Sequence, residues 1–251
     1  MAAFRGKVIA VTGAATGIGR ATARLLARRG ATLSLCDINK SQLQQTVESF
    51  GGRPDDHMVT EVDVSKSNQV NSWIRSTVER FGKLDGAANI AGVGPRIKEL
   101  RDLTDADWNL VQSVNAAGVF YSMRAQLPHM KQDSSIVNCA SVAGLGGSAG
   151  SAEYTASKHA VVGITKVAAR EEGKNGIRVN AVAPGAIDTP LVKEMEKKFN
   201  LPKEEFPLKG AIQERFADPE ECAEVILFLL SEKTKFVTGS IWTVDGGWTT
   251  S

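Results

Sequence analysis

Short apolar runs alternate with amphipathic stretches along the whole 251-residue chain. The runs predict strands and the stretches predict helices, because a strand buried on both faces is apolar throughout, whereas a covering helix is apolar on one side only. Strict alternation of the two is typical of βαβ units around a parallel sheet. The sequence therefore predicts an α/β fold, a doubly wound sheet of seven parallel strands with helices on both faces.

Seven strands and six main helices are expected in one domain over residues 1–251, because neither a Pro/Ser-rich linker nor an internal repeat interrupts their order. The expected strands are 7–12, 32–36, 57–62, 84–90, 135–141, 178–182 and 240–244. The expected helices cover about 18–29, 40–50, 67–81, 105–127, 152–173 and 219–231.

One segment, at about 188–215, is too long for a simple connection between a strand and a helix. Insertions of this length are often lids or binding loops. Val192, Met195 and Phe199 are spaced as one apolar helix face, flanked by lysines and glutamates. Two interpretations are open: a substrate lid, or a surface helix that covers the core.

Charge and composition exclude several classes of protein. With 30 basic and 28 acidic residues, the net charge of +2 favours neither nucleic acid nor an anionic membrane as a partner. No apolar run approaches the roughly 20 residues that span a bilayer, and the first six residues lack the apolar core of a secretory signal. We therefore expect a soluble, cytoplasmic protein without membrane insertion.

The cysteines Cys36, Cys139 and Cys222 are odd in number and far apart, and they lack metal-ligand spacing. A disulfide framework or a metal site is therefore not expected. The sequence predicts three small, buried thiols in a reducing compartment instead.

A glycine-rich turn follows the first predicted strand and opens the first predicted helix. Its glycines, Gly13, Gly17 and Gly19, have the spacing G-x-x-x-G-x-G rather than the usual G-x-G-x-x-G, but the strand–turn–helix context is that of a dinucleotide site. Such a turn brings backbone amides and the positive end of a helix toward a pyrophosphate. We expect a dinucleotide to bind here, with Thr16 and Ile18 among its contacts.

Asp37 indicates which dinucleotide binds. It ends the second predicted strand, where an acidic side chain accepts hydrogen bonds from the adenosine ribose hydroxyls. A carboxylate there repels a 2′-phosphate, and neither Thr16 nor Ile38 supplies the positive charge that NADP needs. NAD is therefore predicted. Arg20 and Lys40 are the basic side chains that could reverse this choice, and Asp37 could also serve as a turn residue or helix cap.

Tyr154 and Lys158 lie four residues apart on a predicted helix, with Ser141 thirteen positions before the tyrosine. Side chains at this spacing share a helix face, about 5–6 Å apart. A tyrosine has an ordinary pKa of about 10, and an ammonium group nearby favours its phenolate. The pattern predicts an enzyme that transfers hydride with Tyr154 as its base, although each residue alone could be structural.

With these motifs, the chain resembles the short-chain dehydrogenase/reductase family over nearly its whole length, as an NAD-preferring member with a Rossmann-type domain. The matching segments follow the family's order and spacing. Besides the glycine-rich turn, Ser141 and the Tyr154-x-x-x-Lys158 motif, they are Asp63-Val64, Asn89-Ile90-Ala91-Gly92, Asn115, Arg178-Val179-Asn180, Pro184-Gly185 through Thr189, and Asp245-Gly246-Gly247.

The resemblance implies a role for each catalytic position. Tyr154 is expected to be the general acid/base, and Ser141 to fix and polarise the substrate oxygen. Lys158 is expected to lower the pKa of Tyr154 and to hold the nicotinamide ribose. Asn115 is expected to anchor a water in the proton relay.

The resemblance also implies further NAD contacts. Asp63 is expected beside the adenine, with Val64 supplying a backbone contact. The adenosine side is lined by Asn89, Ala91 and Gly92, and the nicotinamide carboxamide by Pro184, Gly185, Ile187 and Thr189. The sequence departs from the family's usual Asn-Asn-Ala-Gly at Ile90. We therefore expect one side-chain hydrogen bond bracing the fourth strand to be absent.

The expected walls of the substrate pocket are mostly apolar: Val93, Val142, Leu145, Ala186, Leu191, Val192 and Met195, with Arg96 near the rim. A lipophilic secondary alcohol or its ketone is the predicted small-molecule substrate. Three alternatives stay open: a 3-oxoacyl reductase, a family member repurposed for isomerisation or cyclisation, and a nicotinamide-binding sensor. Such 3-oxoacyl reductases more often use NADPH, which Asp37 disfavours.

The family resemblance suggests a homotetramer. Ala156, Ala160 and Gly163 could let the Tyr154 helix pack on a copy of itself, or could serve packing within one subunit. Trp242 and Trp248 could form a second contact between subunits.

Overall fold

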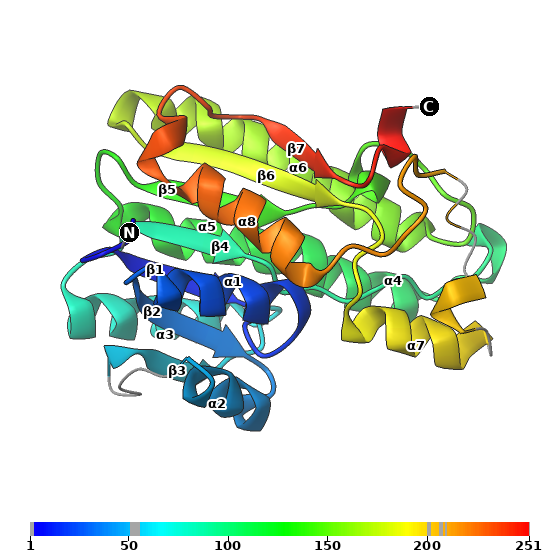
Figure 1. Cartoon of the computed structure of the whole chain (residues 1–251), viewed down its shortest axis with the longest axis horizontal. Helices are drawn as coiled ribbons and strands as arrows, with labels where there is room; N and C mark the ends of the chain where they lie inside the picture. Colours follow the sequence, from blue (N-terminus) through cyan, green and yellow to red (C-terminus); the bar gives the residue numbers. More distant parts are fainter. Residues whose placement is uncertain (1–2, 51–55, 200–201, 206–207, 209, 251) are drawn as a thin grey trace.

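The computed structural model describes residues 3–50, 56–199, 202–205, 208 and 210–250. Its strands form a seven-stranded parallel sheet in the order β3-β2-β1-β4-β5-β6-β7 (Figure 1). The strands are β1 (Val8–Thr12), β2 (Thr32–Asp37), β3 (Met58–Glu61), β4 (Gly86–Asn89), β5 (Ser135–Cys139), β6 (Arg178–Pro184) and β7 (Ile241–Val244). All seven predicted strands are thus present, with ends that differ from the prediction by at most two residues.

Helices cover both faces of the sheet, so the predicted doubly wound domain is confirmed (Figure 1). One face packs against α1 (Gly17–Arg28), α2 (Lys40–Glu48) and α8 (Pro219–Leu230). The other packs against α3 (Ser67–Phe81), α5 (Gly118–Gln126) and α6 (Ala152–Glu172). Two apolar clusters, one on each side of the sheet, form the core. Burial on both faces explains why the strands read as continuous apolar runs.

The continuous helix predicted over 105–127 is wrong in one respect. The structure has α4 (Asp105–Val111), then a π-helical turn (Gln112–Ala117), then α5. Such π turns inside α-helices are frequent at functional sites. Here the turn contains Asn115, whose fully buried side chain bonds to a loop rather than lying along a regular helix face.

The segment at 188–215 contains α7 (Pro190–Phe199). Val192, on its expected apolar face, is buried. The side chains of Met195 and Phe199, predicted for the same face, lie outside the described part of the structure. Cys36, Cys139 and Cys222 are buried free thiols, as predicted. No helix in the described ranges combines the length and apolar character needed to cross a membrane.

The sheet order positions the functional residues. β1 pairs with both β2 and β4, so the direction of winding reverses between β1 and β4. In open α/β sheets, ligands bind beyond the carboxyl ends of the strands at such a switch point. The glycine-rich turn, Asp37, Asp63, Asn89 to Gly92, Ser141 and Pro184 to Thr189 all lie at or after the carboxyl ends of strands, along one edge of the sheet.

Candidate active site

The glycine-rich turn packs so closely that it leaves no room for side chains. A Cβ atom at Gly13 would lie 2.8 Å from the Cα atom of Ala91, and one at Gly19 would overlap the carbonyl oxygen of Gly13. Gly13 also has a φ of +68°, which glycine adopts without strain. At the N-terminus of α1, the side chain of Thr16 makes no capping hydrogen bond. The first amides of α1 thus face a glycine cradle that fits a pyrophosphate.

Asp37 is held beside this turn by two backbone amides. Its Oδ2 accepts a hydrogen bond from the N–H of Ala15, and its Oδ1 accepts one from the N–H of Asn39, each at 3.0 Å. The capping side chain of α2 belongs to Asn39. Asp37 is therefore a turn residue that ties the end of β2 to the glycine-rich turn. The neighbouring Ile38 is 69% exposed, and its side chain is uncharged.

The residues expected beside the adenosine, after β3 and β4, differ in whether their side chains are accessible to a cofactor. Asp63 lies half-buried after β3, where its Oδ1 accepts from the N–H of Ser65, and Val64 is buried. The side chain of Asn89 lies in the core, bonded to Gln126 and Asn138. A contact between residue 89 and a cofactor would therefore come from its backbone.

Thr12 joins the carboxyl ends of β1 and β4. Its hydroxyl oxygen accepts from the backbone N–H groups of Ile90 and Ala91, at 3.0 and 3.1 Å. Ile90 itself is half-buried and packs against the core. The junction is thus braced by Thr12, at the position where this sequence departs from the family's pattern.

Lys158 lies on the first part of α6, one turn after Tyr154. Its Nζ atom is 5.6 Å from the centroid of the Tyr154 ring and donates to the carbonyl oxygen of Cys139 at 2.9 Å. The lysine is buried, which is unfavourable for an ammonium group unless it is hydrogen-bonded. The bond to Cys139, at the end of β5, therefore holds the cation beside the tyrosine.

Asn115 and Gly92 lie next to this lysine. A Cβ atom at Gly92 would be 3.2 Å from Oδ1 of Asn115 and 3.6 Å from Nζ of Lys158. The Nδ2 atom of Asn115 donates to Oγ of Ser157 at 3.2 Å. The π turn, the end of β4 and α6 therefore meet at one point.

Ser141 follows β5 and begins the short helical turn Val142–Gly144. It is extended and buried, and its Oγ accepts from the N–H of Ala143 at 3.2 Å. A Cβ atom at Gly144 would lie 2.7 Å from the carbonyl oxygen of Lys158, so the short helical turn Val142–Gly144 packs directly on α6. This contact fixes Ser141 relative to the helix that carries Tyr154 and Lys158.

The segment after β6 connects the end of β7 to the glycine-rich turn. The N–H of Gly185 donates to the carbonyl oxygen of Val244 at 3.0 Å. Four residues later, Thr189 meets Gly17, where a Cβ atom would lie 3.1 Å from the threonine methyl group. Pro184 and Ile187 are buried between these points. The segment therefore runs past the cradle, as a strip that holds a nicotinamide would.

The nearby cysteine is not a nucleophile. Burial raises the pKa of the Cys139 thiol above its ordinary value, and Lys158 lowers it only in part. The thiol stays neutral at physiological pH, and thiols in that form are poorly reactive. No group of three or more His, Cys, Asp or Glu side chains in the described ranges could hold a metal ion.

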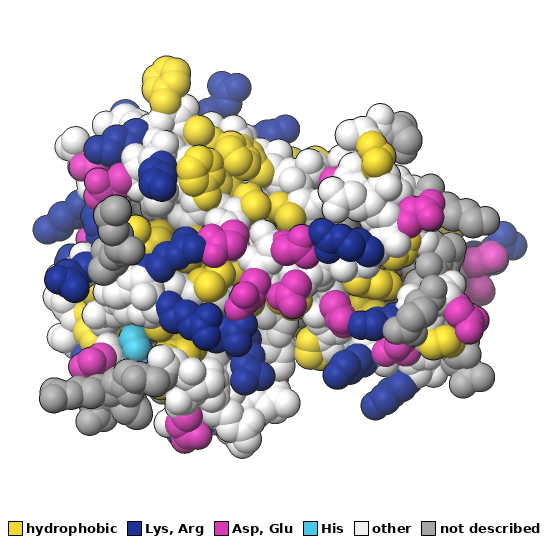
Figure 2. All heavy atoms as spheres, viewed as in Figure 1, with side chains coloured by type: hydrophobic (Ala, Val, Ile, Leu, Met, Phe, Trp, Pro, Cys, Tyr) yellow, Lys and Arg dark blue, Asp and Glu magenta, His cyan; other side chains and the backbone are white. Residues whose placement is uncertain are grey.

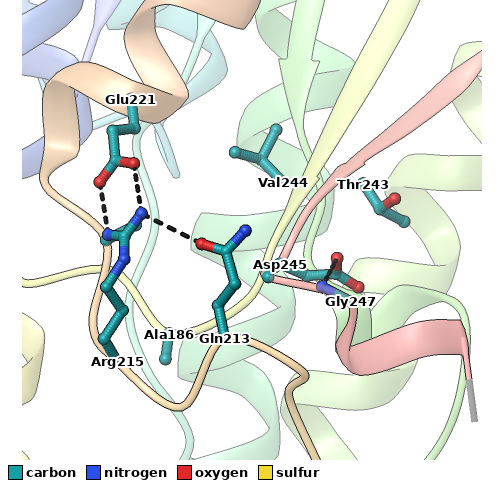
Figure 3. A pocket seen from close by; sticks show the side chains of 10 residues that line it. Ala186, Gln213, Arg215, Glu221, Thr243, Val244, Asp245 and Gly247 are labelled. Carbon is teal, nitrogen blue, oxygen red and sulfur yellow. Dashed lines mark hydrogen bonds and ion pairs between the residues drawn. The ribbon is translucent and has the colours of Figure 1, made fainter.

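A cavity of about 320 Å³ lies beyond the ends of β6 and β7 (Figure 3). The bidentate ion pair of Arg215 and Glu221 forms one side of it, with N–O distances of 2.8 and 2.7 Å. Of the residues expected at the site, only Ala186 contributes to its lining. The cavity therefore lacks the candidate catalytic residues Asn115, Ser141, Tyr154 and Lys158.

Sequence reasoning missed Glu153. This residue precedes Tyr154 in α6, is fully buried, and accepts a hydrogen bond from the backbone N–H of Arg96. Its position in the sequence could have indicated burial. Glu153, Ser157 and Val161 are spaced four residues apart, so Glu153 shares a helix face with the apolar Val161.

Known proteins are similar to this chain over nearly its whole length. A family model described as "Enoyl-(Acyl carrier protein) reductase" matches residues 13–249. The short-chain dehydrogenase/reductase ABA4 of Pyricularia oryzae is 44% identical over 248 residues, which cover 97% of this chain and 92% of that protein. The 3-oxoacyl-[acyl-carrier-protein] reductase FabG of Thermotoga maritima is 39% identical over 246 residues, covering 97% and 98%.

A solved structure agrees with the fold over the same range. The crystal structure of levodione reductase superposes with a TM-score of 0.94 at 37% sequence identity, covering 99% of each chain. The residues around Tyr154 therefore lie in a frame that is also known from experiment.

Proposed function

The chain belongs to the short-chain dehydrogenase/reductase family, and we propose that it is an NAD(H)-dependent enzyme that interconverts a lipophilic secondary alcohol and its ketone. The observation that carries the proposal is the cluster around Tyr154. Lys158 has its Nζ 5.6 Å from the tyrosine ring, Asn115 lies beside it, and Ser141 begins the short turn that packs on the same helix. Hydride transfer needs a proton acceptor at the substrate oxygen, and this cluster supplies one.

Each side chain has a defined task in alcohol oxidation. Tyr154, as phenolate, accepts the hydroxyl proton of the substrate. The Lys158 ammonium, with its Nζ 5.6 Å from the tyrosine ring, favours the negative charge of that phenolate. Ser141 accepts from the N–H of Ala143, which leaves its O–H to donate to the substrate oxygen. NAD, when bound, supplies the hydride acceptor.

Asp37 supports NAD over NADP. Its carboxylate is held by Ala15 and Asn39 at the end of β2, where it can accept hydrogen bonds from ribose hydroxyls and repel a 2′-phosphate. Arg20 and Lys40, the basic residues that could reverse this choice, are both exposed. The preference for NAD over NADP therefore depends on the negative charge of Asp37.

The described pocket walls support a lipophilic substrate. Val93, Ala186 and Leu191 are partly buried, and Val192 is buried. A relative named levodione reductase shares this frame, whereas the relative named 3-oxoacyl reductase keeps a carrier-linked substrate as the alternative. Asp37 disfavours that alternative for the cofactor reason given above.

The start of α7 supports the lid interpretation of the segment at about 188–215. Thr189 meets Gly17 in the phosphate-binding turn, and Leu191 meets Gly94 in the loop after β4. A helix whose first turn touches both the cofactor cradle and the substrate loop is placed to cover a bound substrate.

Two surfaces support a homotetramer. Along α6, the small residues Ala156, Ala160 and Gly163 leave the helix open: a Cβ atom at Gly163 would meet nothing within 4 Å. Over α8 and β7, apolar side chains gather at the surface (Figure 2). In that patch, the rings of Phe228 and Trp242 lie 5.8 Å apart.

The test is the absorbance of reduced nicotinamide when the protein receives NAD or NADP with a panel of lipophilic secondary alcohols. We expect turnover with NAD, and a loss of about 10²- to 10⁴-fold in Tyr154→Phe with unchanged NAD affinity. Full activity in Tyr154→Phe would disprove the assignment. Cofactor binding without reduction across the panel would favour the sensor or the non-redox alternative.

A further inference from the structure

Glu153 is a buried carboxylate next to Tyr154 that the mechanism above does not use. Its Oε1 accepts from the N–H of Arg96 at 2.6 Å, and its Oε2 has no hydrogen-bond partner. A buried carboxylate with an unbonded oxygen is unfavourable for folding. Its one bond therefore indicates what it does: it holds the backbone of the loop between β4 and α4.

That loop does not keep its conformation by local preference. Ile97 has a φ of +53°, in the left-handed region that a β-branched residue rarely adopts. Such strain persists only where the surroundings impose it. Lys98 contributes two bonds that hold this end of the loop. Its N–H donates to the carbonyl oxygen of Gly150 at 3.2 Å, and its Nζ pairs with Asp107 at 2.6 Å.

Two side chains hold the loop near the catalytic residues. Asn115 bonds to the backbone of Val93, and Glu153 bonds to the backbone of Arg96, three residues on. The elements that carry these two residues are also joined, because the side chain of Gln112 in the π turn donates to the carbonyl oxygen of Glu153 at 2.7 Å. The loop is thus tied to the π turn and to the first turn of α6.

The part of the loop between these two bonds supports α7. A Cβ atom at Gly94 would overlap the Leu191 side chain, so the two residues are in direct contact. Displacement of Arg96 would move Gly94, and with it the surface on which the start of α7 rests. Val93 and Leu191 are also expected walls of the substrate pocket.

We propose that Glu153 is a positioning residue for the substrate. By holding the Arg96 amide, it keeps the loop 93–98 against the first turn of α6, so that the pocket between the loop and α7 has its shape before the substrate binds. Glu153 touches neither the reacting atoms nor the cofactor cradle. Its loss therefore weakens substrate binding more than it slows the chemical step. The kinetic part of this proposal rests on the proposed function.

Three substitutions at this position separate the hydrogen bond from charge and bulk. Glu153→Gln keeps the Oε1 acceptor and removes the charge. Glu153→Asp keeps the charge but ends one methylene short of the Arg96 amide, and Glu153→Ala removes the group. Glu171→Ala, an exposed glutamate near the far end of α6, is the matched control.

The first readout is amide hydrogen exchange in the cofactor-free protein, which does not depend on turnover. We expect the Arg96 amide to exchange about tenfold faster in Glu153→Ala and Glu153→Asp than in wild type, the effect of losing one buried hydrogen bond. Glu153→Gln and Glu171→Ala should stay near wild type. Unchanged Arg96 exchange in both Glu153→Ala and Glu153→Asp would overturn the proposal.

The second readout is steady-state kinetics with the best alcohol of the panel. In Glu153→Ala and Glu153→Asp we expect KM to rise about tenfold, with kcat within about threefold of wild type and NAD affinity unchanged. If Glu153→Ala fails to fold, the comparison of Glu153→Asp with Glu153→Gln tests the proposal instead. A Gln variant as impaired as the Asp variant would overturn the proposal, as would a loss in kcat alone. A wild-type protein without turnover would overturn the proposed function, while Arg96 exchange would still decide the role of Glu153 in holding the loop.

Discussion

The side chain of Asn115 forms two hydrogen bonds with the backbone of a single residue, Val93. Its Oδ1 accepts from the N–H of Val93 at 2.8 Å, and its Nδ2 donates to the carbonyl oxygen of Val93 at 3.0 Å. The side-chain amide of Asn115 thus pairs with both the N–H and the carbonyl group of Val93, as the backbone of a neighbouring strand pairs with a residue in a sheet. It continues the order of β4 beyond the point where the sheet ends, into the loop between β4 and α4.

Asn115→Ala should reduce both stability and activity. The substitution leaves the N–H and carbonyl groups of Val93 without this partner, and each such loss costs about 1–3 kcal/mol. We expect a decrease of about 2–4 kcal/mol in the free energy of unfolding by urea, together with a fall in turnover. Asn175→Ala, at an exposed bond to Glu172, is the control and should change stability by less than about 0.5 kcal/mol. Equal stabilities of the two variants would contradict the interpretation.

Gly19→Ala should abolish cofactor binding. The new methyl group would overlap the carbonyl oxygen of Gly13, so the turn must open and the cradle must change shape. Fluorescence titration with NADH should show a loss of at least about tenfold in affinity. Gly173→Ala is the control, because a Cβ atom there meets nothing within 4 Å and the backbone has a φ of −56°. Tight NADH binding by Gly19→Ala would exclude the glycine-rich turn as the pyrophosphate site.

Asp37 should govern the choice of cofactor. Asp37→Ser removes the carboxylate, so kcat/KM with NAD should fall about tenfold, the effect of losing a charge-assisted hydrogen bond to the ribose. Adding Ile38→Arg at this exposed position should then give measurable turnover with NADP, because a guanidinium binds a 2′-phosphate. The single variant Ile38→Arg is the control and should keep its preference for NAD. Wild-type turnover that is faster with NADP would refute this assignment.

The stability of the fold should decrease as the pH falls below about 6.5, in part through His57. Burial lowers the pKa of this histidine below its ordinary value of about 6.5, with Asp56 raising it and Arg80 lowering it to lesser extents. Its Nδ1 accepts from the N–H of Leu33, which requires that nitrogen to be unprotonated.

The sign follows from linkage. Below about pH 6.5 the unfolded chain binds a proton at His57 before the folded chain does, so the stability present above that pH is lost as the pH falls through the folded pKa. Thermal unfolding between pH 7.5 and 5 should show a smaller pH-dependent loss in His57→Leu than in wild type. The exposed His129→Leu should behave as wild type does. Identical pH profiles of wild type and His57→Leu would exclude His57 as a contributor.

A charge in the apolar patch over α8 and β7 should break one of the proposed subunit contacts. Phe228 is exposed there and lies against Trp242. Phe228→Asp should elute as a smaller species than wild type, with its mass checked by light scattering. Leu100→Asp, at an exposed leucine outside this patch, should leave the mass unchanged. A wild-type protein that is monomeric would refute the homotetramer directly.

Local features of the chain were enough to predict most of the fold. The apolar runs and amphipathic stretches located all seven strands, because burial on both faces of a parallel sheet leaves a mark in every strand. The glycine-rich turn was recognisable because close approach of the backbone admits only glycine at positions such as Gly13 and Gly19. Tyr154 and Lys158 could be paired because four residues make about one turn of a helix.

Other features depend on residues that are far apart in the sequence. The Asn89 side chain bonds to Gln126 and Asn138 in the core, 37 and 49 positions away, and nothing around Asn89 in the sequence indicates this. The π turn at Asn115 interrupts a stretch whose composition suits an unbroken helix. Its position makes sense only with Val93, 22 residues earlier, in contact with it.

The sequence by itself thus determined the order of the elements, the parallel sheet and the residue types at its carboxyl edge, because periodicity and glycine geometry are local properties. The tertiary structure alone decided which side chains hold the loop 93–98. Glu153 lies beside Tyr154 in the chain, but its partner Arg96 is 57 residues away and is bound through its backbone amide. Any residue except proline offers that amide, so no pattern of side chains could have marked it.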